Sequence, residues 1–478
     1  MTYRQLLNGN PDFRRLWTGQ VISEIGDWLN NISVLALAIE LASAGRVGQA
    51  IALYAIARHL PLFLFGPIAG VAVDRIDRRR VMIAADVTRA ALALGFLLAN
   101  LFQSLTVIYV VGSSLFAVAT FFNAAKRAST PNLVRGTDEL LSANSLSAST
   151  TAATIAVGSA LGGIIATFVG RNVVFVLNAL TFLASAEMIR RIRANTRKQK
   201  AEGSEQDAVD HDQWSVTIDE LHGLKGESKA RNAPRQSALT AYGILPTAFS
   251  LARRSARDFS EGLRYVRNDF TLASIFIVAA GWGLGNGAAR ALYSIFGARL
   301  GEGAGVAEWI ARPADFGISV LFVAMGLGGV AGAPLARRFN QSTGEGLAKR
   351  MGRSMTLDGV GLAIFSLMPT LLTAALLLVA REMNFAIWWT AQQTIIMKRT
   401  SDHYAGRVFA SYETLTTLMM VGAMYFAGRA SDAYGIQIVA FAGGIVIALS
   451  GLLWFVLRRN DAEDRESLRK QHAMEETE

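Results

Sequence analysis

Long apolar runs, separated by short polar stretches, dominate this chain of 478 residues. Most runs have about 20 residues or more, which is enough for a helix to cross the hydrocarbon core of a bilayer. Because almost no polar face interrupts them, soluble helices are excluded. The pattern predicts twelve membrane-spanning helices, six on each side of a polar interval: 16–42, 48–73, 81–101, 104–125, 146–169, 172–189, 270–297, 315–336, 354–368, 371–397, 408–428 and 436–457.

The polar interval has a composition of its own. Basic, then acidic, then small residues follow one another within 190–257, which favours a flexible cytoplasmic linker. Phe259, Leu263 and Val266 then recur at helical spacing between charged residues, which predicts an amphipathic helix on the membrane surface. The predicted organisation is an N-terminal half (1–189), the linker with this helix (190–269), a C-terminal half (270–458) and a cytoplasmic tail (459–478).

A formal net charge of +10 raises the question of nucleic-acid or other acidic partners, but the placement of the charges points elsewhere. With the N-terminus inside, 38 of the 47 Lys and Arg residues fall on cytoplasmic ends and loops. The outer loops hold only Arg46, Arg171, Arg299, Arg312 and Arg429. This bias predicts a multi-pass protein of the bacterial cytoplasmic (inner) membrane with both termini in the cytoplasm, and no nucleic-acid partner.

Several classes of function lose support from what the sequence lacks. The absence of cysteine rules out disulfides and thiolate metal sites. The first residues contain no short apolar core with a cleavage site, so we expect no cleaved signal peptide. Without a G-x-x-x-x-G-K-[ST] loop or a close set of histidines and carboxylates, we expect no enzyme, no cofactor and no metal.

A strongly basic turn joins the second and third spans. In the second span, just before this turn, Gly66 and Gly70 form a small-xxx-small motif, which favours close packing of helices in lipid. The turn resembles the G-x-x-x-D-R-x-x-R-R loop of the major facilitator superfamily, with Asp77 where the family has its usual glycine. The matching residues are Gly70, Asp74, Arg75, Arg78 and Arg79.

The resemblance implies an all-α fold of two pseudo-symmetric six-helix halves around a central substrate site. Gly66 and Gly70 lie 262 residues before Gly328 and Gly332, as expected for such a repeat. The resemblance also places the carboxylate of Asp74 near the cytoplasmic start of helix eleven. There the helix dipole would favour it as a latch of the outward-open state.

Polar residues form one stripe along the first span and face the bundle interior or an aqueous cavity. They are Gln20, Glu24, Asp27 and Asn31, at spacings of four, three and four. An ionisable group inside a span is costly, so we interpret Glu24 or Asp27 as the site of the coupling proton. The alternative for Asp27 is a permanently paired structural acid.

The second and third spans add further ionisable residues. We expect Arg58 to be the partner of the acids in the first span, and Asp86 and Arg89 to form an internal ion pair. His59 is a candidate for proton transfer, with a hydrogen-bonded packing residue as the alternative.

Three spans of the C-terminal half carry polar and aromatic residues that would suit a substrate cavity. Alternating glycines at 281–287 predict a weak or interrupted seventh span. Arg290 there either binds an anionic or oxygen-rich substrate or pairs with Glu382 or Glu413. The cavity candidates, including those of the first two spans, are Gln20, Asn31, Arg58, Trp282, Asn286, Arg290, Tyr293, Trp388, Gln392, Tyr412 and Glu413.

Within the superfamily, the chain resembles the bacterial exporters of macrolides and enterobactin. The resemblance rests on residues 13–17, 26–28, 58–61 and 261–266, and Gly158 to Gly163 is similar to the G-P-x-x-G-G motif of antiporters with Ser159 in place of proline. It implies proton-coupled efflux of a drug-like or siderophore-like amphipathic small molecule by alternating access in the lipid bilayer. We expect the protein to be monomeric. An uptake permease, a lysophospholipid translocase and a non-transporting sensor that acts through the linker stay open as alternatives.

Overall fold

The computed structural model describes residues 2–193, 257, 259–303, 310–339 and 344–475. The predicted linker at 190–257 lies almost wholly outside the described residues. Within the described ranges, the side chains of Phe63, Pro67, Asp74, Thr137, Ala148, Asp402, His403 and residues 459–475 are not described.

Long α-helices make up the described chain, and each predicted span coincides with one of them. A short helix, α1 (Tyr3–Gly9), precedes them. The first six long helices are α2 (Pro11–Leu41), α3 (Val47–Arg75), α4 (Arg78–Leu101), α5 (Leu105–Leu133), α6 (Gly136–Phe168) and α7 (Arg171–Arg190). The second six are α10 (Phe270–Gly301), α11 (Pro313–Phe339), α12 (Glu345–Phe365), α13 (Leu371–Arg399), α14 (Asp402–Tyr434) and α15 (Ile436–Glu475).

Local capping fixes where several of these helices begin. The side chain of Asn10 accepts a hydrogen bond from the Phe13 amide at the start of α2, at 2.9 Å. Asp77, the residue that departs from the family loop, does the same for α4 by accepting from Arg79 N at 2.9 Å. These caps satisfy amides that have no partner within the helix. Gly170, with a φ of 123°, forms the tight turn between α6 and α7.

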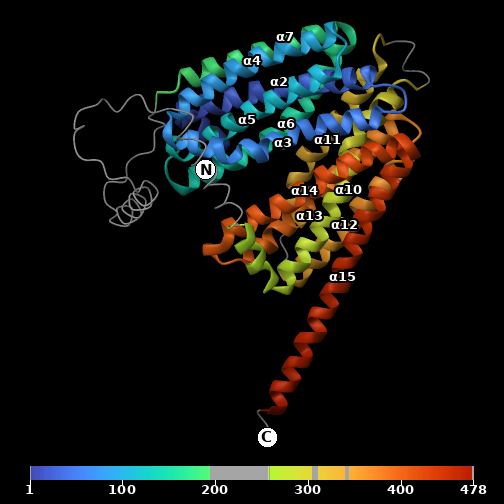
Figure 1. Ribbon diagram of the computed structural model, residues 1–478. Coiled ribbons are helices and arrows are strands. Elements are labelled where there is room, and N and C mark those ends of the chain that lie inside the picture. The colour runs from blue at the N-terminus through green and yellow to red at the C-terminus, as the bar shows by residue number, and fades with distance from the viewer. Residues whose placement is uncertain (1, 194–256, 258, 304–309, 340–343, 476–478) are drawn as a thin grey trace, which may run out of the picture.

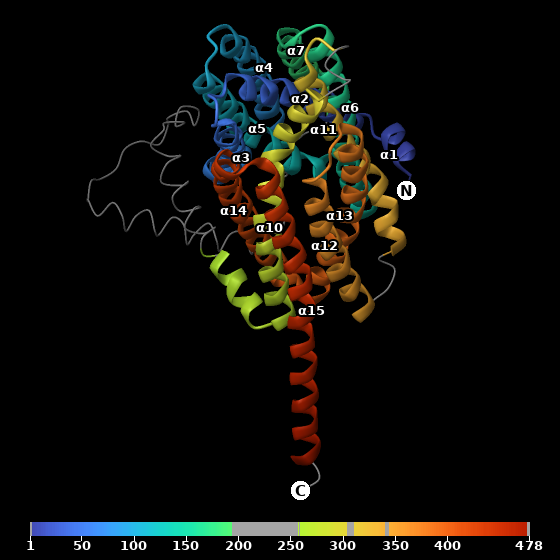
Figure 2. The same cartoon turned by 90° about the vertical axis from the view of Figure 1, so that its right-hand side faces the viewer.

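The helices form two bundles, α2 to α7 and α10 to α15, which approach each other at one end and diverge toward the other (Figure 1). We call the end with residues 76–77 and 400–401 the basic end, and the end with 42–46 and 435 the far end. Figure 2 shows the C-terminal bundle with α15 projecting from it beyond the basic end.

Nine helices of the described residues are long and apolar enough to cross a membrane by length and composition alone. Of the long helices, α2, α12 and α14 are not among them, and each contains several ionisable residues. The remaining nine are α3, α4, α5, α6, α7, α10, α11, α13 and α15.

Several helices extend past the apolar runs that predicted them, and α6 begins at Gly136, ten residues before its predicted span. The helix α12 begins at Glu345, nine residues before the predicted span, and its first nine residues include Lys349, Arg350 and Arg353. The helix α15 continues through the predicted tail to Glu475. Hydropathy marks the part of a helix that lies in lipid, whereas the backbone hydrogen bonds continue into the polar region.

Residues 259–267 are helical, as the sequence predicts, and pack on α14. Gly262 makes this close approach possible, because a Cβ there would lie 2.6 Å from the Arg407 carbonyl oxygen. The Tyr265 ring stacks on Tyr404 with centroids 4.7 Å apart. Val266 is buried but Leu263 is exposed, so the predicted apolar face is divided between the protein and its surroundings. Its position on a membrane surface stays a prediction.

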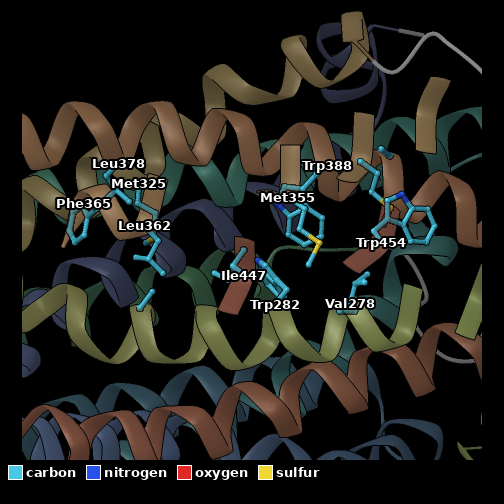
Figure 3. Packing of buried hydrophobic residues seen from close by; sticks show 14 of the residues in the cluster. Val278, Trp282, Met325, Met355, Leu362, Phe365, Leu378, Trp388, Ile447 and Trp454 are labelled. Atoms are coloured by element: carbon cyan, nitrogen blue, oxygen red, sulfur yellow. The ribbon is translucent and has the colours of Figure 1, made fainter. Parts of the chain in front are cut away.

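Each bundle has its own apolar core. The larger one fills the C-terminal bundle, and Figure 3 shows how aromatic and aliphatic side chains from its helices interdigitate. Trp282, Trp388 and Trp454 lie within it and are almost fully buried. The main cluster of the N-terminal bundle also includes Ala298 of α10 and Ile318 of α11, so apolar packing joins the two bundles at the far end.

Candidate functional site

A cavity of about 780 Å³ lies between the two bundles. Aromatic side chains form part of its wall, with Trp28 from α2 and Phe385 and Trp389 from α13. Its charged lining residues are Arg290, Arg337 and Glu382. The lining residues of α11 run from Met325 to Arg337, so the cavity extends toward the basic end.

A smaller pocket of about 210 Å³ shares Trp28, Arg290 and Met325 with this cavity and lies further toward the far end. Its polar lining comes from both bundles: Asn31 of α2, Arg58 and His59 of α3, and Arg290 and Tyr293 of α10. No aspartate or glutamate belongs to the described lining of this pocket.

Polar contacts close the far end between the bundles. The Arg171 guanidinium of α7 donates to both carboxylate oxygens of the fully buried Asp315 of α11, at 2.9 Å (Nε to Oδ1) and 2.7 Å (Nη2 to Oδ2). The Asp432 carboxylate of α14 accepts from the amides of Gly48 and Gln49 at the start of α3, at 2.7 and 2.8 Å. The structure is therefore closed at the far end.

Glu24 on α2 lies in a dense polar network. Its carboxylate accepts hydrogen bonds from Gln20 Nε2 at 2.8 Å and from Thr154 Oγ1 at 3.1 Å, and its Oε1 lies 3.7 Å from Lys126 Nζ. Gln20, Lys126 and Thr151 also line a polar cavity of about 480 Å³ between α2, α5 and α6. Glu24 thus has a cationic partner and lies beside a polar cavity.

Asp27 shares one arginine with a second acid. Arg89 of α4 forms an ion pair with the fully buried Asp86, and its Nη1 lies 3.6 Å from Asp27 Oδ2. The rings of Phe122 and Phe182 lie against the guanidinium, with Cζ 4.4 and 4.3 Å from the centroids. When both acids are ionised, the group of Asp27, Asp86 and Arg89 carries one net negative charge.

The C-terminal bundle repeats this arrangement with other residues. Arg381 of α13 lies 3.0 Å from the buried Asp358 of α12, measured from Nε to Oδ1, and 3.9 Å from Glu382. Arg381 also donates a hydrogen bond to the Tyr293 hydroxyl. Glu382 faces the central cavity, so this group too has two acids and one arginine beside the proposed substrate path.

The structure corrects the predicted partner of the acids on α2 and confirms another pair. Arg58 donates to Asn31 Oδ1 at 2.5 Å, and its guanidinium lies over the rings of Trp28 and Phe116. It makes no ion pair with either acid among the described residues. The predicted pair of Asp86 and Arg89 is confirmed.

His59 satisfies one ring nitrogen within its own helix. Its Nδ1 lies 2.8 Å from the Ala55 carbonyl oxygen, which can only accept, so Nδ1 carries the proton in this contact. This is the hydrogen-bonded packing arrangement of the alternative interpretation. The rest of the ring lines the small pocket, so a role in proton transfer stays a prediction.

The predicted interruption of the seventh span is wrong, because α10 is continuous from Phe270 to Gly301. Its glycines allow close contact with two neighbours instead. A Cβ on Gly285 would lie 2.4 Å from the Gly443 carbonyl oxygen of α15, and one on Gly287 would lie 2.3 Å from the Met420 carbonyl oxygen of α14. Tight tertiary packing outweighs the low helix propensity of glycine here.

Only part of the predicted wall on α10 reaches the cavity. Trp282 and Asn286 are buried at 6% and 5% exposure and line neither cavity, whereas Arg290 and Tyr293 line the small pocket. Arg290 makes no hydrogen bond or ion pair with Glu382 or Glu413 in the described part of the chain. A direct pair is therefore absent from this conformation, and Glu382 interacts with Arg290 only at longer range.

On α13 and α14, the predicted cavity residues belong to the core. Trp388, Gln392 and Tyr412 are almost fully buried, and Glu413 is exposed but does not line the central cavity. The residues of α13 that do line it are Glu382, Phe385, Ala386, Trp389 and Thr390. Periodicity identified stripes on this helix, but it could not determine which stripe faces the other bundle.

Some residues of the site were missed by the sequence analysis. Phe385 follows Glu382 by three positions and precedes Trp389 by four, a spacing that could have indicated the cavity face of α13. Asp315 and Asp432 lie at the ends of spans. Charged residues there usually contact water, so their sequence positions did not indicate a contact between the bundles. Their partners lie in the other bundle, far away in sequence.

The arginines of the basic turn attach it to its own bundle. Arg78 is buried and donates to the Ala128 carbonyl at 2.7 Å, and Arg79 donates to the Arg190 carbonyl. A Cβ on Gly66 or Gly70 would meet nothing within 4 Å, so the predicted close packing at these glycines is absent from this conformation. The Asp74 side chain lies outside the described residues, and its role as a latch stays a prediction.

Glycines of α6 pack on both bundles. A Cβ on Gly158 or Gly162 would lie within 3 Å of the α2 backbone, at the Ile25 and Leu29 carbonyl oxygens. One on Gly163 would lie 2.0 Å from Ser319 Oγ of α11. The stretch similar to the antiporter motif thus provides close packing within one bundle and between the two.

The sequence profile described as the Major Facilitator Superfamily matches residues 16–424. The chain belongs to this superfamily. It is therefore a membrane transporter of the all-α major facilitator fold, which confirms the resemblance found in the basic turn.

Individual relatives of this superfamily member are distant. BacE of Bacillus subtilis, provisionally named a bacilysin exporter, is 22% identical over 424 residues, which cover 87% of this chain and 88% of BacE. Macrolide efflux protein A of Streptococcus pyogenes is 36% identical over 86 residues, or 18% of this chain and 20% of that protein. The crystal structure of the nucleoside transporter NupG, at 11% identity, superposes with a TM-score of 0.63 over 93% of this chain and 99% of NupG. NupG shows the shared fold.

Proposed function

We propose that this transporter exports a drug-like or siderophore-like amphipathic small molecule in exchange for protons, by alternating access of the central cavity. The observation that carries the proposal is the cavity between the bundles, closed at the far end and lined by aromatic and charged side chains. Relatives named for export of bacilysin and of macrolides favour the outward direction.

Orientation follows from the basic end. Since Lys and Arg concentrate there, the positive-inside rule favours a cytoplasmic location for this end and for both termini. The cavity would then take its solute from the cytoplasm or the inner leaflet. Opening of the far end would release it outside.

Proton coupling is supported by the charge balance around Arg89. Protonation of Asp27 leaves Arg89 with Asp86 as a neutral pair in a region of low dielectric. Asp27 has 28% of its side chain exposed, so a proton can reach it, whereas Asp86 has none exposed. Glu24 already has Lys126 as a partner, so we assign the proton to Asp27 first.

The latch is the second part of the mechanism. Closing the basic end would bring the C-terminal end of α3 toward the start of α14, where the helix dipole favours a carboxylate. We expect Asp74→Asn to insert normally and to lose transport. Normal transport by this variant would contradict the latch and would indicate that the basic turn only fixes the orientation in the membrane.

Drug accumulation in cells tests the proposed function. Bacteria that lack their own exporters would receive the intact chain, and uptake of radiolabelled erythromycin and of a catecholate siderophore would be followed with and without a protonophore. Export predicts lower accumulation of at least one compound, reversed by the protonophore. Higher accumulation would indicate uptake, and headgroup-dependent movement of lysophospholipids alone would indicate a lipid translocase.

A further inference from the structure

The small pocket between the bundles is rich in positive charge for a site inside a membrane protein. Arg58 of α3 and Arg290 of α10 both line it, one from each bundle, and His59 lies beside them. Its described lining contains no carboxylate. Cations at this depth are costly unless a partner compensates them.

Arg290 has no such partner in direct contact among the described residues, and its interaction with Glu382 is one of longer range. It is exposed to the cavities, and it makes no hydrogen bond or ion pair with any described residue. Arg58 has one hydrogen bond, to the neutral side chain of Asn31, and two aromatic rings against its guanidinium. Most of the donors of the two guanidinium groups therefore remain available.

The two carboxylates that interact with these arginines each contact another arginine more closely. Asp27 interacts with Arg58 at longer range but lies beside Arg89, and Glu382 interacts with Arg290 but lies beside Arg381. Neither acid lines the small pocket. The pocket thus holds two guanidinium groups whose interacting acids lie outside it, and each of these acids contacts another arginine more closely.

We propose that this pocket binds the anionic group of the substrate, and that the transported molecule is an organic acid with a large apolar or aromatic body. Arg58 and Arg290 would hold the anion with charge-assisted hydrogen bonds. The body of the molecule extends into the larger cavity, which continues from the pocket past Trp28 and Met325 and offers Phe385 and Trp389 as stacking surfaces.

The position of the pocket gives the anion a further role. Because Arg58 and Arg290 belong to different bundles, an anion between them draws the two bundles together at this level. This inference rests on the proposed transport for its meaning in the cell, but binding of the anion can be measured without transport.

Binding to the purified full-length protein tests the proposal. Three probes would be compared by thermal shift and by equilibrium titration: fusidate, which is an amphipathic carboxylate, its uncharged methyl ester, and the cationic macrolide erythromycin. We expect fusidate to bind at least about tenfold more tightly than its ester, as one lost charge-assisted contact predicts. Arg290→Gln and Arg58→Gln would reduce this preference to about twofold or less, and Arg290→Lys would retain most of it.

Arg338→Gln is the matched control. It removes the same charge from the exposed basic end of α11 and lines neither cavity, so the preference for fusidate should persist. Equal or absent binding of fusidate and its ester, tighter binding of erythromycin, or an unchanged preference in folded Arg290→Gln would each overturn the proposal. Acid-selective binding without any export from cells would retain the anion site and contradict the proposed function instead.

Discussion

At the scale of single residues, glycine decides how closely the helices approach. At Gly359 of α12, an added Cβ would lie 2.1 Å from the Ala448 amide nitrogen of α15. At Gly422 of α14, it would meet nothing within 4 Å. Both glycines lie inside long helices, so alanine gives both the same gain in helix propensity. Any difference between the two substitutions therefore reports packing.

We predict that Gly359→Ala lowers the stability of the purified protein by about 1–3 kcal/mol, the usual range for an overpacked core. Gly422→Ala should leave stability unchanged or raise it slightly. Thermal unfolding in detergent, followed by tryptophan fluorescence, measures both. Equal midpoints for the two variants would contradict the close contact of α12 and α15.

Contacts of single residues in the site were only partly predictable from the sequence. The ion pair of Asp86 and Arg89 was predictable because its partners are one helical turn apart. Arg58 was assigned to the wrong partner because the choice between Asn31 and the acids depends on the relative rotation of α2 and α3. Trp388 was misplaced for a similar reason, since it and Trp389 are neighbours in sequence but only Trp389 lines the cavity.

At the scale of elements, α3 and α14 form a pair that joins the two bundles at the far end. The carboxylate of Asp432, near the end of α14, accepts from two amides at the start of α3. An anion at this position interacts favourably with the positive end of the helix dipole. The predicted latch of Asp74 would use the opposite ends of the same two helices, so α3 and α14 are suited to hold either end closed.

We predict that Asp432→Asn weakens closure of the far end and raises the population of its open form, by about fivefold for a lost cap of about 1 kcal/mol. The chain has no cysteine, so Phe102→Cys and Leu367→Cys, both exposed at this end, provide unique sites for spin labels. Longer label distances in Asp432→Asn would report the opening.

Glu345→Gln serves as the control, because that exposed acid pairs with Lys349 of its own helix and lies at the basic end. It should leave the distances between the labels unchanged. Identical distance distributions in Asp432→Asn and the unsubstituted labelled protein would contradict the role of this contact.

Element positions were the most predictable part of the fold. The need to satisfy every backbone polar group in lipid makes a long apolar run a helix, so the apolar runs marked the positions of the long helices, including α2, α12 and α14 with their several ionisable residues. The early start of α12 and the extension of α15 were missed because polar helices leave no mark in hydropathy. The continuity of α10 was missed because glycine propensity is a weak guide where neighbouring backbones pack closely.

At the scale of the whole molecule, the two bundles each contain one buried arginine shared by two carboxylates. Arg89 lies beside Asp27 and Asp86 in the N-terminal bundle. Arg381 lies beside Asp358 and Glu382 in the C-terminal bundle. Between them lies a cavity closed at the far end. An acid that accepts a proton on one side of a rocking motion and releases it on the other would couple the proton gradient to solute export.

Proton movement in proteoliposomes that contain the purified transporter tests this central claim most directly. Erythromycin, a catecholate siderophore and fusidate would each be added to wild type, to Asp27→Asn, and to Asp138→Asn, which removes an exposed acid from the first turn of α6. We predict solute-triggered proton movement in wild type and Asp138→Asn and its loss in Asp27→Asn. Undiminished proton movement in Asp27→Asn would contradict the assignment of the coupling proton.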